Sequence, residues 1–328
     1  MITFQKRPKA LLLFSGGLDS ILAAKILEAE KIKVTPICFE SFFFNCNLAK
    51  KSAKNLGLKL KIIDFSKEHL KVVKNPKYGR GSGMNPCIDC HLLMLKKAKE
   101  LMSTSAKGYG GSSKTSSKGG KKEKYDFVAT GEVLGERPFS QNQRALNLIE
   151  KEAGLEGLIL RPLSAKLLTA TIPEKMGWLK RENLFDIEGR SRKPQFALAK
   201  KFKIKDFPGP AGGCILTDPQ YSQRLKNLFE KIPDFDANDA QFLRKGRNFW
   251  EDKFLIIVGR NEAENKELKK LKKKRDLILE PKNFPGPTVL IRSFGKKANS
   301  EIREKGKEIL IKYSKKLAKS PKISENEI

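Results

Sequence analysis

Residues 10–20 read Ala-Leu-Leu-Leu-Phe-Ser-Gly-Gly-Leu-Asp-Ser, an apolar run that ends in two glycines flanked by hydroxyl groups and a carboxylate. The run predicts a buried strand, and the apolar spacing after it predicts a helix. Gly16 and Gly17 can adopt backbone conformations closed to other residues, which lets the main chain approach an anion. Ser15 and Ser20 add hydroxyl donors, and the helix directs its N-terminal N–H groups at the same place. We therefore expect a strand, loop and helix that together bind the phosphates of a nucleotide.

Asp19 is the charged residue of this loop. A carboxylate would repel phosphate unless a cation lies between them, so we expect Asp19 to coordinate Mg²⁺. The Lys-Ser/Thr ending of a Walker A loop and the three-glycine spacing of dinucleotide folds are both missing. The hexapeptide Ser15–Ser20 instead resembles the SGGxDS loop of the PP-loop ATP pyrophosphatases. That resemblance implies that the loop holds ATP while a substrate carbonyl is adenylated and pyrophosphate is released.

Short apolar runs recur along the first half of the chain and alternate with helix-like segments. The runs span residues 10–14, 34–39, 58–65, 127–130 and 158–161. Alternation of this kind predicts a doubly wound α/β fold, with a mostly parallel sheet covered by helices on both faces. The resemblance implies the same fold, the adenine nucleotide alpha hydrolase or PP-loop type. In such sheets ligands bind beyond the carboxyl ends of the strands, where Ser15–Ser20 falls.

Changes in composition divide the chain into three expected regions. Residues 1–165 form the ATP-binding domain, in which the Ser-, Gly- and Lys-rich stretch 103–124 is expected to be a mobile insertion. Residues 166–238, with short helices and Pro-rich turns, predict a small irregular region that carries Cys214. Residues 239–328 predict a basic C-terminal α+β domain. Its expected elements are strands at 254–258, 277–280 and 288–292 and a helix at 298–316.

The chain carries 67 Lys and Arg residues against 37 Asp and Glu, a formal net charge of +30. Such a surface favours a polyanionic partner, because phosphate backbones bind it by counterion release. A lysine-rich composition of the kind found in some thermophiles would also explain the charge. No apolar run approaches the ~20 residues that a membrane span needs. We therefore expect a cytoplasmic protein that binds no membrane.

Five cysteines occur in the chain, and their number argues against a disulfide framework and for metal or sulfur chemistry. Cys38 lies inside a predicted strand and is expected in the core, whereas Cys46 is given no role. Cys87 and Cys90 begin a predicted helix that Asn85 can cap, and they share one face of its first turn. A helix N-terminus favours thiolate over thiol, which suits metal binding or nucleophilic chemistry.

Cys214 follows two glycines in a turn that would let its thiol approach a partner. Together with Cys87 and Cys90 it would suit a 4Fe–4S cluster with one iron open to a non-protein ligand. A metal-free alternative pairs Cys90 with Cys214, one carrying a persulfide and the other resolving it by disulfide formation. A third alternative is three buried, inert cysteines.

Residues 8–225 resemble the tRNA thiouridine synthetases, the ThiI and MnmA group within the PP-loop superfamily. The similar blocks are Asn85–Cys90 (the CxxC motif), Ala129–Gly135 (a nucleotide-contacting ATGE segment), Ser140-Gln141, Leu160–Leu163 and Gly213-Cys214. The resemblance implies ATP-dependent tRNA thiolation, with Gly131 and Glu132 close to the nucleotide and the three cysteines handling sulfur. Members with three such cysteines carry a 4Fe–4S cluster and members with two use a persulfide, so this chain is expected to carry the cluster.

The C-terminal part resembles a second family, the NFACT-R RNA-binding domain. The similar segments are Ile256–Asn265, Asp276-Leu277 and Pro285–Val289. Residues 266–275 add seven basic side chains in ten, which also could be an ordinary solvated helix face. Together with the resemblance to the NFACT-R domain, this run favours contact with an RNA backbone over a solvated helix face. The expected contacts are Arg260, Lys269, Lys270, Lys272 and Lys273.

The leading hypothesis is therefore an ATP-dependent tRNA sulfurtransferase whose partners are tRNA and a sulfur donor, either sulfide or a persulfide carrier. One alternative is a PP-loop enzyme that adenylates a small molecule. Another is an RNA-binding adaptor with a non-catalytic nucleotide site. The modified uridine, the position of the sulfur and a homodimeric state are left open by the sequence.

Overall fold

The computed structural model describes residues 7–103, 124–209, 214–314, 316–317 and 322–327. Two compact units divide the chain, residues 1–213 and residues 214–328, and each is described by itself. This division has two parts where the sequence analysis expected three regions. The insertion expected at 103–124 lies outside the described residues, apart from its two end residues.

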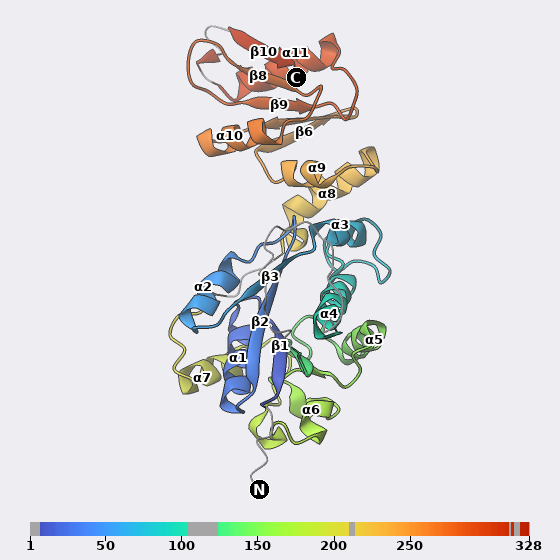
Figure 1. The fold of residues 1–328 in the computed structure, drawn as a ribbon. Coiled ribbons are helices and arrows are strands. Elements are labelled where there is room, and N and C mark those ends of the chain that lie inside the picture. The colour runs from blue at the N-terminus through green and yellow to red at the C-terminus, as the bar shows by residue number, and fades with distance from the viewer. Residues whose placement is uncertain (1–6, 104–123, 210–213, 315, 318–321, 328) are drawn as a thin grey trace, which may run out of the picture. The chain divides into compact units, whose positions relative to one another are not determined.

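The first unit contains a sheet of five strands and the helices around it (Figure 1). Its strands are β1 (Lys9–Leu13), β2 (Lys33–Glu40), β3 (Lys61–Asp64), β4 (Phe127–Thr130) and β5 (Ile159–Leu160). Its helices are α1 (Leu18–Ala29), α2 (Asn47–Asn55), α3 (Ser66–Lys74), α4 (Cys87–Ser103), α5 (Gln143–Ala153), α6 (Ile172–Lys175) and α7 (Lys193–Lys201), with short 3₁₀ turns η1 (Ala165–Leu167) and η2 (Arg181–Asn183).

All strand pairs of this sheet are parallel, and the strand order is β3-β2-β1-β4-β5. Alternate side chains of β1 enter two separate cores, since Ala10 and Leu12 face one side and Leu11 faces the other. Helices α1, α2 and α7 pack on the first side, and α4 and α5 pack on the second (Figure 1). The predicted doubly wound α/β fold is therefore confirmed.

The strand order places a topological switch point between β1 and β4. The chain leaves β1 towards β2 on one side and later returns to β4 on the other side of β1. In doubly wound sheets the crevice for a ligand opens at this point, beyond the carboxyl ends of the strands. Ser15–Ser20 follows β1 and Gly131–Glu132 follows β4, so the two expected nucleotide-contacting segments flank the switch point.

The second unit contains an antiparallel sheet with strand order β10-β8-β9-β7-β6. Its strands are β6 (Arg247–Glu251), β7 (Phe254–Val258), β8 (Leu277–Pro281), β9 (Val289–Arg292) and β10 (Ile323–Glu327). Its helices are α8 (Pro219–Lys231), α9 (Ala237–Phe242), α10 (Glu262–Leu271) and α11 (Ser300–Lys312), with the 3₁₀ turn η3 (Ile215–Thr217). Helix α11 covers one face of the sheet, where Gly306 lets it approach Ile291 and Leu279 closely. This confirms the expected C-terminal α+β domain.

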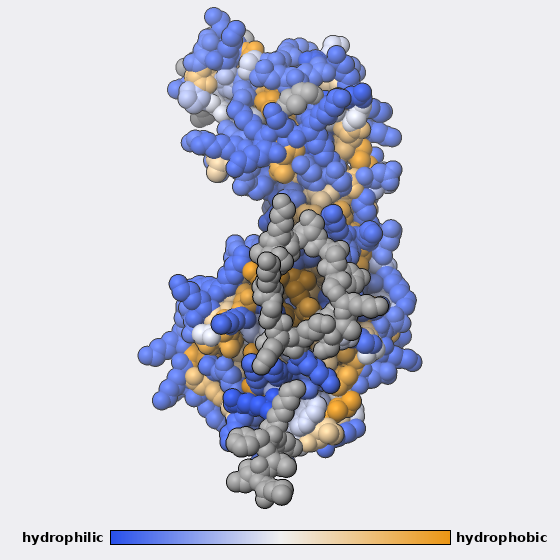
Figure 2. All heavy atoms as spheres, in the orientation of Figure 1, coloured by the Kyte–Doolittle hydropathy of each residue, from blue (hydrophilic) through white to orange (hydrophobic). Residues whose placement is uncertain are grey.

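Hydrophilic residues dominate the surface of both units on the face that Figure 2 shows, in line with the high content of charged residues. None of the helices in the described parts of the chain combines the length and the hydrophobicity that a bilayer span requires.

Candidate active site and RNA-binding surface

The Ser15–Ser20 loop is closed by its own hydroxyl groups. The Ser20 hydroxyl donates to the Gly17 carbonyl at 2.8 Å and accepts from the Gly16 N–H at 3.1 Å. Gly16 has φ +80°, and a side chain there would lie 2.7 Å from the backbone of Ala49 in α2. Gly17 begins α1 without a side-chain cap, which leaves the first N–H groups of a 12-residue helix available to an anion. The loop therefore has the geometry of a phosphate-binding turn.

Gly131 joins the end of β4 to this loop. A Cβ atom at Gly131 would lie 2.6 Å from the Asp19 carbonyl carbon and 2.6 Å from the Ser20 nitrogen. These are backbone atoms of the first turn of α1, which cannot rotate away as a side chain can. The ATGE-like segment therefore packs against the phosphate loop, whereas the expected contact of Gly131 with a nucleotide stays a prediction.

Glu132 is held by side chains of the protein. Its carboxylate accepts from Arg161 Nε at 2.9 Å and from the Thr130 hydroxyl at 3.0 Å, and His91 Nδ1 lies 2.9 Å from it. Arg161 is 3% exposed and also pairs with Glu150. Burial raises the pKa of Glu132, but Arg161 and His91 outweigh it and hold the pKa well below its ordinary range. The side chain thus braces β4 against β5 and α4, while its contact with a nucleotide stays a prediction.

Asp19 lies at the start of α1 among charged side chains that the sequence analysis did not foresee. Burial raises the pKa of its carboxyl above the ordinary value, although Arg192, the neighbouring Gln195 and Arg137 oppose the rise. Its Oδ1 atom is buried and has no hydrogen-bond partner among the described residues. One carboxylate with a free oxygen is what a Mg²⁺ ion held mainly by nucleotide phosphates requires, so the residue fits the expected role.

The CxxC segment begins α4. Asn85 does not cap the helix as expected, since its side-chain amide donates to Cys87 Sγ at 3.1 Å and its Oδ1 accepts from the Gly83 N–H. Burial raises the pKa of the Cys87 thiol, and Asn85 and Arg137 only partly oppose it. The expectation of a readily formed thiolate is therefore wrong for Cys87 in this state. Cys90 is 8% exposed and packs in the hydrophobic core.

Arg137, in the segment after β4, connects the loop with the CxxC segment. Its charge opposes the rise in the pKa of the Asp19 carboxyl and of the Cys87 thiol, so Arg137 lies within electrostatic reach of each. The phosphate loop and one sulfur atom therefore share a single electrostatic environment. No local sequence pattern marked Arg137, because an exposed arginine after a glycine-rich turn is common on any surface.

Cys214 belongs to the second unit, where it precedes the 3₁₀ turn η3 and is half-buried. The grouping of Cys214 with Cys87 and Cys90 stays a prediction. Among the residues that the structure describes, no set of three or more His, Cys, Asp and Glu side chains is arranged to hold a metal ion.

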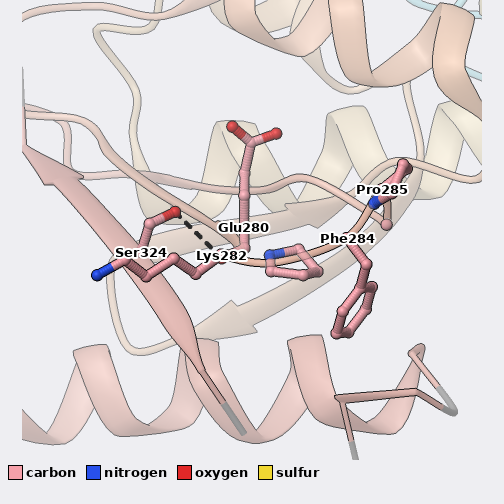
Figure 3. Close-up of a pocket in the computed structure, with 7 residues that line it drawn as sticks. Glu280, Lys282, Phe284, Pro285 and Ser324 are labelled. Carbon is pink, nitrogen blue, oxygen red and sulfur yellow. Dashed lines mark hydrogen bonds between the residues drawn. The ribbon is translucent and has the colours of Figure 1, made fainter. Parts of the chain in front are cut away.

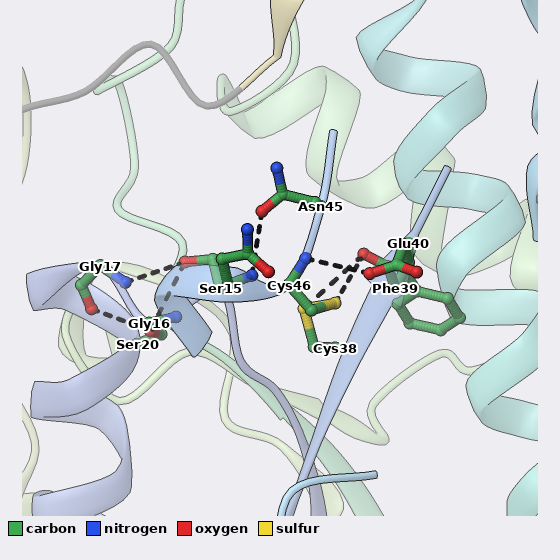
Figure 4. The surroundings of a disulfide bond; sticks show 10 residues. Ser15, Gly16, Gly17, Ser20, Cys38, Phe39, Glu40, Asn45 and Cys46 are labelled. Carbon is green, nitrogen blue, oxygen red and sulfur yellow. Dashed lines mark hydrogen bonds between the residues drawn. A yellow bond between two sulfur atoms is a disulfide. The ribbon is translucent and has the colours of Figure 1, made fainter. Parts of the chain in front are cut away.

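Cys38 and Cys46 form a disulfide beneath the phosphate loop (Figure 4). Cys38 is buried as expected, but the inference from cysteine number against disulfides is wrong for this pair. The bond ties the end of β2 to the residue before α2, and α2 in turn contacts the loop, since the Ser52 hydroxyl donates to the Gly16 carbonyl at 2.9 Å. The disulfide thus supports the helix on which Gly16 packs.

Reduction of this disulfide is expected to lower the free energy of unfolding by about 2–3 kcal/mol, because the intact bond closes a short loop and so lowers the conformational entropy of the unfolded chain. Urea unfolding with and without a reductant measures the change. A Cys38→Ala/Cys46→Ala variant is the control and should show no response of this size to the reductant. An unreduced digest that lacks the peptide linking the two cysteines would contradict the prediction.

The expected RNA-binding residues divide into two groups in the second unit. Arg260 pairs with Glu264, Lys269 lies 2.8 Å from Glu280, and Lys273 lies 2.8 Å from Asp239. Lys270 and Lys272 are exposed on and after α10. The second group is therefore the more available to a phosphate backbone, because each residue of the first group already pairs with a carboxylate. RNA contact by all five residues stays a prediction.

A pocket of about 270 Å³ lies at the turn that follows β8 (Figure 3). Its lining includes the Phe284 ring, the Lys282 side chain and Ser324, whose hydroxyl donates to the Glu280 carbonyl at 3.1 Å. The lining thus includes an aromatic residue and a lysine, residue types that single-stranded RNA can use for stacking and for phosphate contact. The sequence analysis assigned no role to these residues.

Several solved structures are similar to this chain. A predicted subunit of a tRNA methyltransferase from Methanocaldococcus jannaschii is 20% identical with a TM-score of 0.31, over 47% of this chain and 69% of that one. A 4-thiouridine synthetase solved with RNA and bound ATP is 19% identical with a TM-score of 0.39, over 71% of this chain and 52% of that one. An NMN synthetase from Francisella tularensis is 10% identical with a TM-score of 0.27, over 62% of this chain and 89% of that one.

The chain thus spans about half the length of the 4-thiouridine synthetase. No curated protein matches the sequence. One family model matches, and it covers most of the second unit, including β6, all but the last residue of β10 and every residue expected to contact RNA. Residues 246–326 match the NFACT protein RNA binding domain, as the resemblance of their sequence predicted.

Proposed function

We propose that this protein is an ATP-dependent tRNA sulfurtransferase. The observation that carries the proposal is the connection of the phosphate loop to the helix that the CxxC segment begins: Gly131 packs on Asp19 and Ser20, and the adjacent Glu132 contacts His91 of α4 at 2.9 Å. A loop that binds ATP beside a cysteine suits a reaction in which a carbonyl is first activated and then receives sulfur. The match of residues 246–326 to an RNA-binding domain family supports RNA as the substrate.

In the proposed reaction the Ser15–Ser20 loop and the N-terminus of α1 hold the pyrophosphate part of ATP. A uridine carbonyl oxygen attacks the α-phosphate, pyrophosphate leaves, and sulfur later displaces AMP to give thiouridine. Asp19 would hold Mg²⁺ through the oxygen that no described residue satisfies. The raised pKa of Cys87 keeps its thiol protonated until the substrate or a sulfur carrier changes its surroundings.

Cys87 and Cys90 lie one helical turn apart, and with Cys214 they would supply the three thiolates that a 4Fe–4S cluster needs. When bound, the cluster would present sulfur to the activated carbonyl. The donor set fits in kind, since soft thiolates are the usual ligands of such clusters. Without metal, a persulfide on Cys90 or Cys214 would displace AMP through its outer sulfur, and the other cysteine would then cleave the resulting S–S bond. This step releases the thiouridine and leaves a disulfide between the two cysteines.

The decisive test is analysis of tRNA nucleosides from a strain that lacks this protein, with the wild-type gene and a Cys87→Ser variant returned separately. A thionucleoside should disappear in the deletion strain, return with the wild-type gene and stay absent with the variant. Iron and acid-labile sulfide, measured on anaerobically purified protein, separate the cluster from the persulfide. Unchanged thionucleosides in the deletion strain would overturn tRNA thiolation and favour a small-molecule substrate.

A further inference from the structure

Three residues near the phosphate loop carry buried polar atoms that no described residue satisfies. They are Asp19 through Oδ1, Arg192 through Nε, and Gln195 through both Nε2 and Oε1. Gln195 is 0% exposed, and its amide lowers the pKa of Asp19 without forming a well-aligned hydrogen bond. Buried polar groups normally have partners, so this concentration in one place indicates a built site for a polar ligand.

The packing of α7 on α1 brings these residues together. Leu198 and Ala199 of α7 share a core with Leu18 and Leu22 of α1, which fixes one helix against the other. Arg192 precedes α7 and Gln195 lies in its first turn, so both stand beside the start of α1. This is the end of α1 that the Ser15–Ser20 loop enters.

Arg137 approaches the same place from the segment after β4, together with Glu136. Burial, and then the charge of Asp19, raise the pKa of Glu136, although Arg137 and Arg192 oppose the rise. The two arginines therefore act on these carboxyls through space. Arg161 differs in that its Nε and Nη1 atoms pair with Glu132 and Glu150, and only its Nη2 atom has no partner among the described residues.

We propose that Arg137, Arg192 and Gln195 form a second phosphate-binding site, opposite the Ser15–Ser20 loop, that takes the α-phosphate of the bound nucleotide. The inference rests on the proposed function, in which that phosphate links AMP to the activated carbonyl. Guanidinium groups bind phosphate through two parallel N–H bonds, and the Gln195 amide adds a buried donor.

Calorimetric titrations with AMP, pyrophosphate and ATP test this site on the full chain. Arg137→Gln and Arg192→Gln should each weaken AMP binding by at least about tenfold, the effect of losing one charge-assisted contact, and should leave pyrophosphate binding unchanged. Arg192→Lys should restore only part of the loss, because an ammonium lacks the planar fork. Arg144→Gln, at an exposed position of α5, is the matched control and should bind all three ligands as the wild type does.

Unchanged AMP affinity in both arginine variants overturns the second site. A loss of pyrophosphate affinity as large as the loss of AMP affinity also overturns it, because such a result would indicate a disturbed Ser15–Ser20 loop. Filter binding of tRNA in the absence of nucleotide tests whether these residues bind an RNA phosphate instead. If the arginine variants lose affinity for tRNA but keep their affinity for AMP, the proposal is overturned. Thermal unfolding verifies that each variant is folded. If the wild-type protein binds neither ATP nor pyrophosphate, the proposed function itself fails, and that outcome differs from the failure of the arginine site alone.

Discussion

Replacement of Gly131 by valine is expected to weaken ATP binding by roughly 100-fold, equivalent to about 2.7 kcal/mol. Even the first carbon of a side chain at this position would lie 2.6 Å from backbone atoms of Asp19 and Ser20. The start of α1 and the end of β4 would have to separate, and the N–H groups of the helix would lose their alignment with the phosphates. Equilibrium dialysis with ATP measures the loss.

Gly131→Ala and Gly209→Val are the companion variants. The alanine variant should show a smaller loss, because a methyl group requires less displacement than an isopropyl group. Gly209 lies in the same unit, and a Cβ atom there would meet no atom of the described residues within 4 Å, so valine at that position should leave ATP binding unchanged. A folded Gly131→Val protein with wild-type affinity for ATP would show that the nucleotide does not depend on this junction.

Most strands of the first unit could be predicted because strands buried on both faces are nearly continuous apolar runs. The edge strand β3 is mostly exposed, and it was found through the longer apolar run at 58–65 that contains it. Strands β7, β8 and β9 of the second unit were predicted from similar apolar runs. Strands β6 and β10 were not. They form the two edges of the antiparallel sheet, and their sequences, Arg-Asn-Phe-Trp-Glu and Ile-Ser-Glu-Asn-Glu, carry the polar residues that edge strands use.

The candidate site also has a part that the sequence predicts and a part that it does not. The Ser15–Ser20 loop is contiguous, so its turn and helix start follow from the sequence alone. Arg137, Arg192 and Gln195 come from distant segments. The packing of α7 on α1 places Arg192 and Gln195, and the segment after β4 places Arg137. Their roles could not be predicted without the fold.

The cysteines show how burial can change a local expectation. The position of Cys87 at a helix N-terminus favours a thiolate, but burial of the sulfur outweighs that effect and raises the pKa of its thiol. The Cys38–Cys46 bond depends on the return of the chain from β2 to the start of α2, which spacing alone does not reveal. The local sequence pattern therefore marked Cys87 as a candidate site residue, but it predicted neither the protonation of its thiol nor the Cys38–Cys46 disulfide.

Replacement of Arg161 by methionine is expected to lower the free energy of unfolding at pH 7 by about 3–5 kcal/mol, because it leaves two partly buried carboxylates without their cation. The Arg161 side chain is 2% exposed and the Glu132 side chain 12%, so water cannot replace the lost partner. Urea unfolding at pH 7 measures the loss. Arg144→Met, at an exposed position of α5, is the control and should change stability little.

The deficit of Arg161→Met should shrink as the pH falls. In the wild type the pKa of Glu132 is lower when folded than its ordinary value of 4.5, so its stabilising effect is complete above that value and is lost as the pH falls towards the folded pKa. In the variant burial dominates, the pKa of Glu132 rises, and protonation relieves the uncompensated charge. Wild type and variant should therefore approach each other in stability below about pH 4.5. If the difference in the free energy of unfolding between wild type and variant stays constant from neutral to acidic pH, the lost stability comes from packing and not from the ion pair.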